Sequence, residues 1–139
     1  MTESLTILDG GMGSELAKRG LGASDGIWSA KALLEVPDLV AEVHRDFIKS
    51  GARVIITNSY STIPSYLEKE NMAGRYLELT ELAGRIARQV VDESDQQVLV
   101  AGSLPPLDVS YRADLVPEDT EAQPIYANLV TALEPHVDL

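Results

Sequence analysis

Three short runs of apolar, β-branched residues, separated by stretches with helical periodicity, constrain the fold of this chain more than any other feature. The runs are Leu5–Leu8, Arg53–Thr57 and Val98–Ala101. Strands that alternate with helices favour a parallel sheet, because each helix returns the chain to the end of the sheet where the strand began. The strand starts lie roughly 45 residues apart, a spacing that suits a barrel with long loops. The sequence therefore predicts an α/β fold.

Four stretches between and after these runs have the apolar spacing of helices that pack on one face. Proline near the start and glycine just past the end are typical boundary signals, seen here at Pro37, Gly20 and Gly51. The region between the first helix and Trp28 is rich in Gly, Ser and Asp, which predicts a loop over 21–28. The expected helices are Ser14–Arg19, Pro37–Ser50, Met72 or Arg75 to Asp92, and Asp119–Leu133.

The chain has 139 residues, which fits one domain, and its last residues resemble the opening of a further strand. Val137 and Leu139 alternate with polar neighbours after the fourth helix. Three full strands and a strand start would make an open sheet with unpaired edges, whereas parallel strands are normally covered on both sides. We therefore expect residues 1–139 to be one partial domain whose C-terminal part is missing.

Composition excludes several classes of function. Hydrophobic residues make up 45% of the chain, enough for a packed core, and the formal net charge is −11. That charge argues against nucleic acid or an anionic membrane surface as a partner. The chain has no cysteine and hence no disulfide, thiol nucleophile or thiolate metal ligand. Without a signal peptide or an apolar run long enough to span a membrane, the expected location is the cytoplasm.

A carboxylate followed by two glycines, Asp9-Gly10-Gly11, ends the first apolar run. Ligands of α/β proteins bind at the carboxyl ends of parallel strands, and glycine lets a ligand approach main-chain N–H groups. An aspartate at that point can face a cationic group such as a substrate ammonium. The alternative is a plain strand-to-helix turn in which Asp9 is the helix N-cap. The glycines do not form G-x-G-x-x-G or a P-loop, so nucleotide binding is disfavoured.

Taken in order, the strand ends and one loop resemble the homocysteine S-methyltransferase family. Each motif is weak alone, but their order and spacing together are specific, and the resemblance covers essentially the whole chain. It implies the N-terminal part of a (β/α)8 TIM barrel: about three βα units plus the start of a fourth strand. The motifs are Asp9-Gly10-Gly11-Met12-Gly13, Gly26-Ile27-Trp28-Ser29, Thr57-Asn58-Ser59-Tyr60 and Gly102-Ser103-Leu104-Pro105-Pro106-Leu107.

The reaction that this resemblance implies is methyl transfer to the thiol of homocysteine, which gives methionine. The run Gly102–Leu107 with Ser110-Tyr111-Arg112 looks like the microbial branch that uses sulfonium donors, namely S-methylmethionine or S-adenosylmethionine. The family binds zinc through three cysteines, and zinc makes the thiol a thiolate at neutral pH. This chain has none of the three, and His44 and His136 have no metal-ligand spacing. We expect no metal ligands, no catalytic residues and no activity from this chain alone.

The resemblance also assigns substrate-binding roles. Asp9 would receive the homocysteine ammonium, with Gly10 and Ser29 near the substrate carboxylate as donors. Asn58 would orient the site by hydrogen bonding, although turn chemistry is the alternative for this residue. Trp28 and Tyr60 would stand near the methyl donor, where a sulfonium gains cation–π energy over an aromatic face. Their alternatives are a loop anchor for the tryptophan and strand-end packing for the tyrosine.

Two other functions remain open at this stage. The chain could be a non-catalytic part-barrel that pairs its open edges with another copy of itself or with another chain. It could also be a fragment of a different α/β-barrel enzyme that handles a phosphorylated or amino-acid substrate. The absence of cysteine distinguishes a non-catalytic part-barrel from an active methyltransferase.

Overall fold

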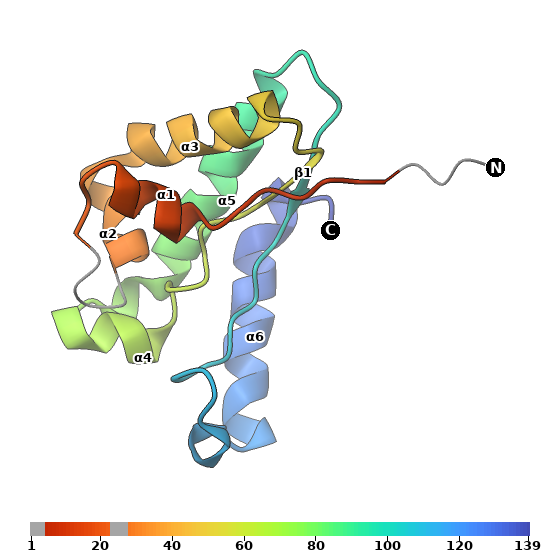
Figure 1. Ribbon diagram of the computed structural model, residues 1–139. Coiled ribbons are helices and arrows are strands. Elements are labelled where there is room, and N and C mark those ends of the chain that lie inside the picture. The colour runs from red at the N-terminus through yellow and green to blue at the C-terminus, as the bar shows by residue number, and fades with distance from the viewer. Residues whose placement is uncertain (1–4, 23–27) are drawn as a thin grey trace.

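The computed structural model describes residues 5–22 and 28–139, and only the backbone of Trp28. A two-stranded parallel sheet, β1 and β2, lies beside helices α1 to α6 (Figure 1). The strands are β1 Val54–Ile56 and β2 Leu99–Ala101. The helices are α1 Met12–Lys18, α2 Trp28–Glu35, α3 Pro37–Lys49, α4 Pro64–Leu67, α5 Tyr76–Asp92 and α6 Asp119–Leu133. Four 3-10 turns complete the described elements: η1 Glu68–Glu70, η2 Ala73–Arg75, η3 Ala113–Leu115 and η4 Glu134–His136.

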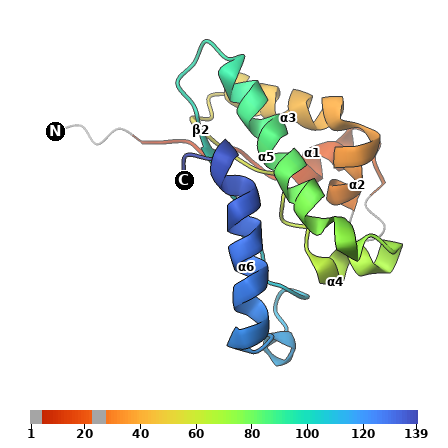
Figure 2. The same cartoon turned by 180° about the vertical axis from the view of Figure 1, so that it is seen from behind.

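The two faces of the sheet differ because paired residues of parallel strands point to the same side. Ile55 pairs with Val100, and both are fully buried against apolar residues of α3 and α5. Figure 2 shows these two helices from behind the sheet. On the other face Leu99, which pairs with Val54, remains 45% exposed. The helices therefore cover one face of the sheet within the part of the chain that the structure describes.

The first predicted strand, Leu5–Leu8, is wrong as a full strand. It makes a single bridge, from Leu8 to Val54, supported by backbone bonds of Arg53 N to Ile7 O (2.8 Å) and Asp9 N to Val54 O (2.9 Å). Leu5 is 94% exposed. Leu8 lies opposite Val54, which is the first residue of β1, so the residues before Leu8 extend past the start of that strand and have no strand residue opposite them. The segment still lies parallel to β1 at the position expected of a first strand.

The predicted opening of a fourth strand lies beside β2, to which Asp138 and Leu139 bond through the backbone. Leu139 N donates to Val100 O at 3.2 Å, and Gly102 N donates to Leu139 O at 2.9 Å, the alternating pattern of a parallel pair. The order across the sheet is thus Leu8, β1, β2 and residues 137–139. Consecutive parallel neighbours in chain order are what the start of a (β/α) barrel requires.

The predicted helices are confirmed with small shifts at their ends. α6 has the predicted bounds, α3 ends one residue early, and α5 starts at Tyr76 after η2. α2 was missed, because a loop was predicted over 21–28 and no helix between Trp28 and Pro37. Ala32 and Leu33 of α2 are each 1% exposed, so this short helix gains its stability from packing that local periodicity did not indicate.

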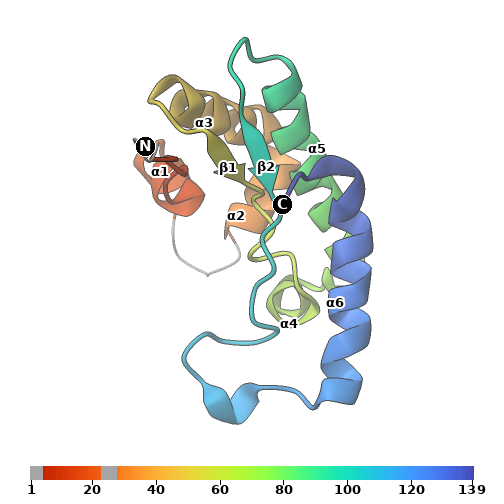
Figure 3. The ribbon, with the colours of Figure 1, turned by 90° about the vertical axis from the view of Figure 1, so that its right-hand side faces the viewer.

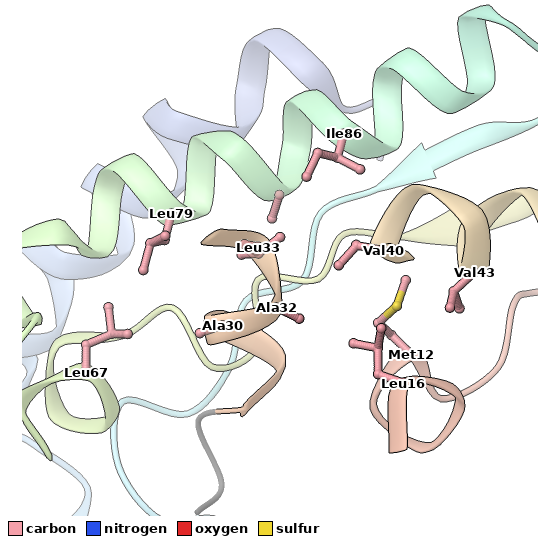
Figure 4. Close-up of a cluster of buried hydrophobic side chains, with 11 residues drawn as sticks. Met12, Leu16, Ala30, Ala32, Leu33, Val40, Val43, Leu67, Leu79 and Ile86 are labelled. Carbon is pink, nitrogen blue, oxygen red and sulfur yellow. The ribbon is translucent and has the colours of Figure 1, made fainter. Parts of the chain in front are cut away.

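The main core lies where α1, α2, α3, α4 and α5 meet (Figure 4). It holds α1 and α2 against α3. The starts of α1 and α2 are thereby fixed beside the carboxyl end of the sheet. Its buried members are Met12, Leu16, Ala30, Ala32, Leu33, Val40, Val43, Leu67, Leu79, Ala83 and Ile86.

Candidate functional site

A pocket of about 320 Å³ opens at the carboxyl end of the parallel strands, next to the starts of α1 and α2. Figure 3 shows β1 and β2 side by side. Five of the six predicted substrate-binding residues line the pocket, although they come from three separate parts of the chain. The lining is Asp9, Gly10, Met12, Gly13, Ser29, Ile56, Thr57, Asn58, Tyr60, Ser61 and Ser103.

The side chain of Asp9 is tied to the neighbouring strand at one oxygen only. Its Oδ2 accepts a hydrogen bond from the backbone N–H of Ile56 at 2.8 Å. Its Oδ1 is buried and has no hydrogen-bond partner among the described residues. The N-cap alternative is wrong, because α1 is capped by Gly11 and no side chain caps it.

Burial raises the pKa of the Asp9 carboxyl above its ordinary value, and the hydrogen bond from Ile56 opposes this effect. None of the described lysines, arginines or histidines forms a salt bridge with Asp9. A partly desolvated carboxylate with an unused oxygen is destabilised until a cation or donor approaches it. The arrangement therefore suits a cationic ligand group at the pocket.

Gly10, which also lines the pocket, packs closely against Phe47 of α3. A Cβ built on Gly10 would lie 2.9 Å from Cε1 of Phe47, closer than side-chain carbons come to one another. A larger residue would have to displace Phe47 or the backbone beside Asp9. Glycine here is a requirement of close packing, and it keeps the main chain open to the pocket.

Asn58 joins two walls of the pocket. Its Nδ2 donates to the carbonyl oxygen of Ser29 at 2.8 Å, and Ser29 Oγ donates to Ser61 Oγ at 3.0 Å. The Asn58 bond spans 29 residues, so this side chain is used for a tertiary contact, in contrast to the local turn bond that was the alternative. Asn58 is 5% exposed, which leaves it well placed to hold the start of α2 against the end of β1.

The aromatic residues predicted near a methyl donor have different positions in the structure. Tyr60 lines the pocket, is 43% exposed, and its hydroxyl is hydrogen-bonded to Ser110 Oγ in the segment after β2. Trp28 begins α2, but its side chain lies outside the described part of the structure, as do Gly26 and Ile27. Contact of either ring with a donor stays a prediction.

The pocket contains polar residues to which sequence reasoning gave no role. Thr57, Ser61 and Ser103 lie in it, beside Met12, Gly13 and Ile56. The signal available in the sequence was the cluster of hydroxyl residues directly after β1, together with Ser103 after β2. That pattern was used to identify the motifs, but a hydroxyl bonds so many kinds of partner that residue type alone suggested no function.

The donor set for a zinc ion is not present in the residues described. The sequence has no cysteine, and the described residues include no group of three or more His, Asp or Glu that could hold a metal. His44, in α3, is fully buried with both ring nitrogens unpartnered, and burial lowers its pKa to about 4. It is a neutral core residue. Among the described helices, none is both long and apolar enough to cross a membrane.

Comparisons with known proteins identify relatives of the chain. It is 36% identical to the homocysteine S-methyltransferase of Escherichia coli K12, over 81% of this chain and 38% of that protein. It is 39% identical to the homocysteine S-methyltransferase YbgG of Bacillus subtilis 168, over 66% of this chain and 30% of that one. The chain thus spans less than half the length of these curated relatives.

The fold agrees with that relationship. The crystal structure of the E. coli homocysteine methyltransferase MmuM in its metallated form matches 99% of this chain with a TM-score of 0.85 and 33% identity. The match covers 53% of the MmuM chain. The sequence profile of the homocysteine S-methyltransferase family matches residues 6–139. The chain therefore belongs to the homocysteine S-methyltransferase family.

Proposed function

We propose that this chain supplies the amino-acid-binding part of a methyltransferase site that transfers a methyl group from a sulfonium donor to homocysteine. The donor is S-methylmethionine or S-adenosylmethionine, and the product is methionine. Residues 1–139 form the N-terminal part of the catalytic (β/α)8 barrel in this proposal. Family membership supports the reaction, and the pocket at the strand ends supports the location.

The observation that carries the proposal is the unpartnered Oδ1 of Asp9 at the pocket. The ammonium of homocysteine would donate to it and supply the positive charge that the described residues do not. A charge-assisted bond in a partly desolvated pocket is stronger than the same bond at a surface. The substrate carboxylate would then accept hydrogen bonds from the backbone of Gly10 and from Ser29, with Asn58 holding Ser29 in place.

The other end of the substrate needs groups that this chain does not supply. A thiol near its ordinary pKa of about 8.5 is mostly protonated at neutral pH and is then a poor nucleophile. Zinc held by cysteine ligands would supply the thiolate in a complete domain, but the residues described here do not fit that ion. The role of this chain is to bind and orient the amino-acid end, with Trp28 and Tyr60 beside the donor.

A binding experiment tests this role directly. L-Homocysteine is titrated into the chain under reducing conditions by calorimetry, beside N-acetyl-L-homocysteine, which has the same thiol and carboxylate but no ammonium. We expect L-homocysteine to bind at least about tenfold more tightly, since a charge-assisted bond contributes roughly 1.5–3 kcal/mol. Equal affinities, or no binding of L-homocysteine, would overturn the proposal.

A second candidate is a part-barrel stabilised by association with another copy of the chain. The exposed Leu8 and Leu99 favour it, as does an apolar pocket of about 320 Å³ at the far edge of the sheet, where Leu104 and Leu139 lie. Light scattering in dilute buffer would test it. A dimer supports association, and a monomer that unfolds cooperatively contradicts it. The family match disfavours the remaining alternative, a fragment of an unrelated α/β barrel.

A further inference from the structure

Two buried hydroxyls form a closed ring of hydrogen bonds with the backbone of Ser103. The backbone N–H of Ser103 donates to Thr57 Oγ1 at 3.0 Å. Thr57 Oγ1 lies 2.8 Å from Ser59 Oγ, which in turn donates to the carbonyl oxygen of Ser103 at 2.9 Å. Thr57 is 3% exposed and Ser59 is 1% exposed, so water does not replace these bonds easily.

The direction of each bond in the ring is fixed by chemistry. An amide N–H can only donate and a carbonyl oxygen can only accept, whereas each hydroxyl has one proton to give. Ser59 gives its proton to the Ser103 carbonyl, so Thr57 must give its own to Ser59. Every donor in the ring is used once, and the ring joins residues 44 and 46 positions apart in sequence.

The ring lies just beyond the regular pairing of β1 and β2. The last ladder bond at this end runs from Thr57 N to Ala101 O at 2.9 Å. Without the hydroxyls, the backbone of Ser103 would lose its connection to β1 at the place where Ser103 enters the pocket lining. Asn58 lies between the two hydroxyl residues and bonds to Ser29. Three consecutive side chains, 57 to 59, therefore connect the ends of β1 and β2 and the start of α2.

We propose that Thr57 and Ser59 are positioning residues that hold Ser103 at a fixed place in the wall of the amino-acid site. This inference rests on the function proposed above. Apolar residues of the same shape would leave the backbone N–H and carbonyl oxygen of Ser103 without these partners, a loss of stability that breaking any buried hydrogen bond would cause. What a closed ring adds is one defined backbone position, and a binding pocket depends on such positions to within a fraction of an ångström.

The test uses Thr57→Val, which keeps the shape and removes the hydroxyl, and Thr57→Ser, which restores it. Thr131→Val is the matched control, because its hydroxyl bonds only to Ala127 O within α6, far from the pocket. Amide hydrogen exchange is followed by NMR at Ser103 and, as a reference within β2, at Leu99. We expect Thr57→Val to speed exchange at Ser103 by about tenfold, since the amide loses its acceptor, with little change at Leu99.

The second measurement is the affinity for L-homocysteine, which a purely structural bond would not alter. We expect Thr57→Val to weaken binding by at least about threefold, and Thr57→Ser to stay within about twofold of the original chain. Ser59→Ala breaks the ring at the Ser103 carbonyl and should weaken binding similarly, with a smaller rise in exchange at Ser103 because that amide keeps Thr57 Oγ1 as its acceptor. It also serves as the test if Thr57→Val does not fold.

The outcomes distinguish a failure of this inference from a failure of the proposed function. Unchanged exchange at Ser103 overturns the ring, and faster exchange with unchanged affinity for L-homocysteine overturns the positioning role. If the unaltered chain does not bind L-homocysteine at all, the proposed function fails and this role fails with it. Binding by the unaltered chain with no effect of either variant contradicts only the inference drawn here.

Discussion

Asp9 and Asp138 make the same local contact in two regions of the molecule, but their charges are balanced differently. Each Oδ2 accepts a hydrogen bond from a backbone N–H of the neighbouring strand at 2.8 Å, from Ile56 for Asp9 and from Val100 for Asp138. Asp138 Oδ2 also accepts a bond from Arg88 Nη2 at 2.7 Å, which makes an ion pair. Asp9 forms no such pair with any residue in the described ranges.

The difference moves the two pKa values in opposite directions. Desolvation raises the pKa of Asp9, whereas the bond from Val100, helped by Arg88, lowers the pKa of Asp138. Arg88 also donates from Nε to the carbonyl oxygen of His136 at 3.0 Å, so its position is fixed by two contacts. Asp138 thus stabilises the edge of the sheet, whereas Asp9 keeps an oxygen that can bind a ligand. The backbone contact does not distinguish the two carboxylates; the deeper burial of Asp9 and the Arg88 counter-ion of Asp138 do.

The largest expected effect concerns binding at Asp9. Asp9→Asn keeps an acceptor for the Ile56 N–H but removes the charge. In a hybrid enzyme in which this chain replaces the matching part of the E. coli relative, we expect kcat/KM for homocysteine to fall by tens- to thousands-fold, for a loss of about 2–5 kcal/mol. Steady-state kinetics measure it. Zinc content is the control and should not change. Near-normal kcat/KM would reduce Asp9 to a turn residue.

A smaller effect is expected on the free energy of unfolding. Here the substitution of Asp138 should cost more than that of Asp9. Asp138→Ala leaves the Val100 N–H without its acceptor and Arg88 without its partner. The Asp138 side chain is 35% exposed, so we expect a loss of about 1–2 kcal/mol in the free energy of unfolding. Asp9→Ala loses one hydrogen bond but also relieves an unbalanced charge, so its loss should be smaller. Urea unfolding compares the two, with Arg88→Met as the control for the ion pair. An equal or larger loss for Asp9→Ala would break the comparison.

The smallest effect concerns the pH dependence of stability, which should have opposite signs for Asp138 and Asp9. The folded-state pKa of Asp138 is below the unfolded value, so its contribution to stability is present above that value and is lost as pH falls through the folded pKa. Burial places the folded-state pKa of Asp9 above its ordinary, unfolded value, so ionisation of Asp9 costs stability as pH rises through that range. Unfolding is measured from about pH 3 to 7, where these carboxyls titrate.

Asp138→Asn should fall further below the unaltered chain as pH rises, and Asp9→Asn should gain on it. Each variant removes one negative charge from a chain of net charge −11, so general repulsion changes equally in both. A same-sign pH dependence for the two variants would contradict the assigned pKa directions.

Local periodicity and boundary residues identified much of the fold before the structure was considered. The bounds of α6 and the start of α3 at Pro37 agree with expectation, and the chain end that resembled a strand opening bonds to the backbone of β2. The motifs also gave the family, and the pocket includes Asp9, Gly10, Ser29, Asn58 and Tyr60. These features follow from short-range pattern, because helix faces and strand ends repeat at fixed intervals along a chain.

The sequence by itself determined which residue types stand at the strand ends; only the tertiary structure decided which partners they meet. Leu5–Leu8 has the composition of a strand, but its single bridge is at Leu8, opposite the first residue of β1. Asp9 could have capped a helix, and instead it bonds to Ile56, 47 residues away. The ring of Thr57 and Ser59 around Ser103 has the same origin. Hydrogen bonds between distant residues depend on how elements pack in three dimensions, and a linear pattern carries no record of that packing.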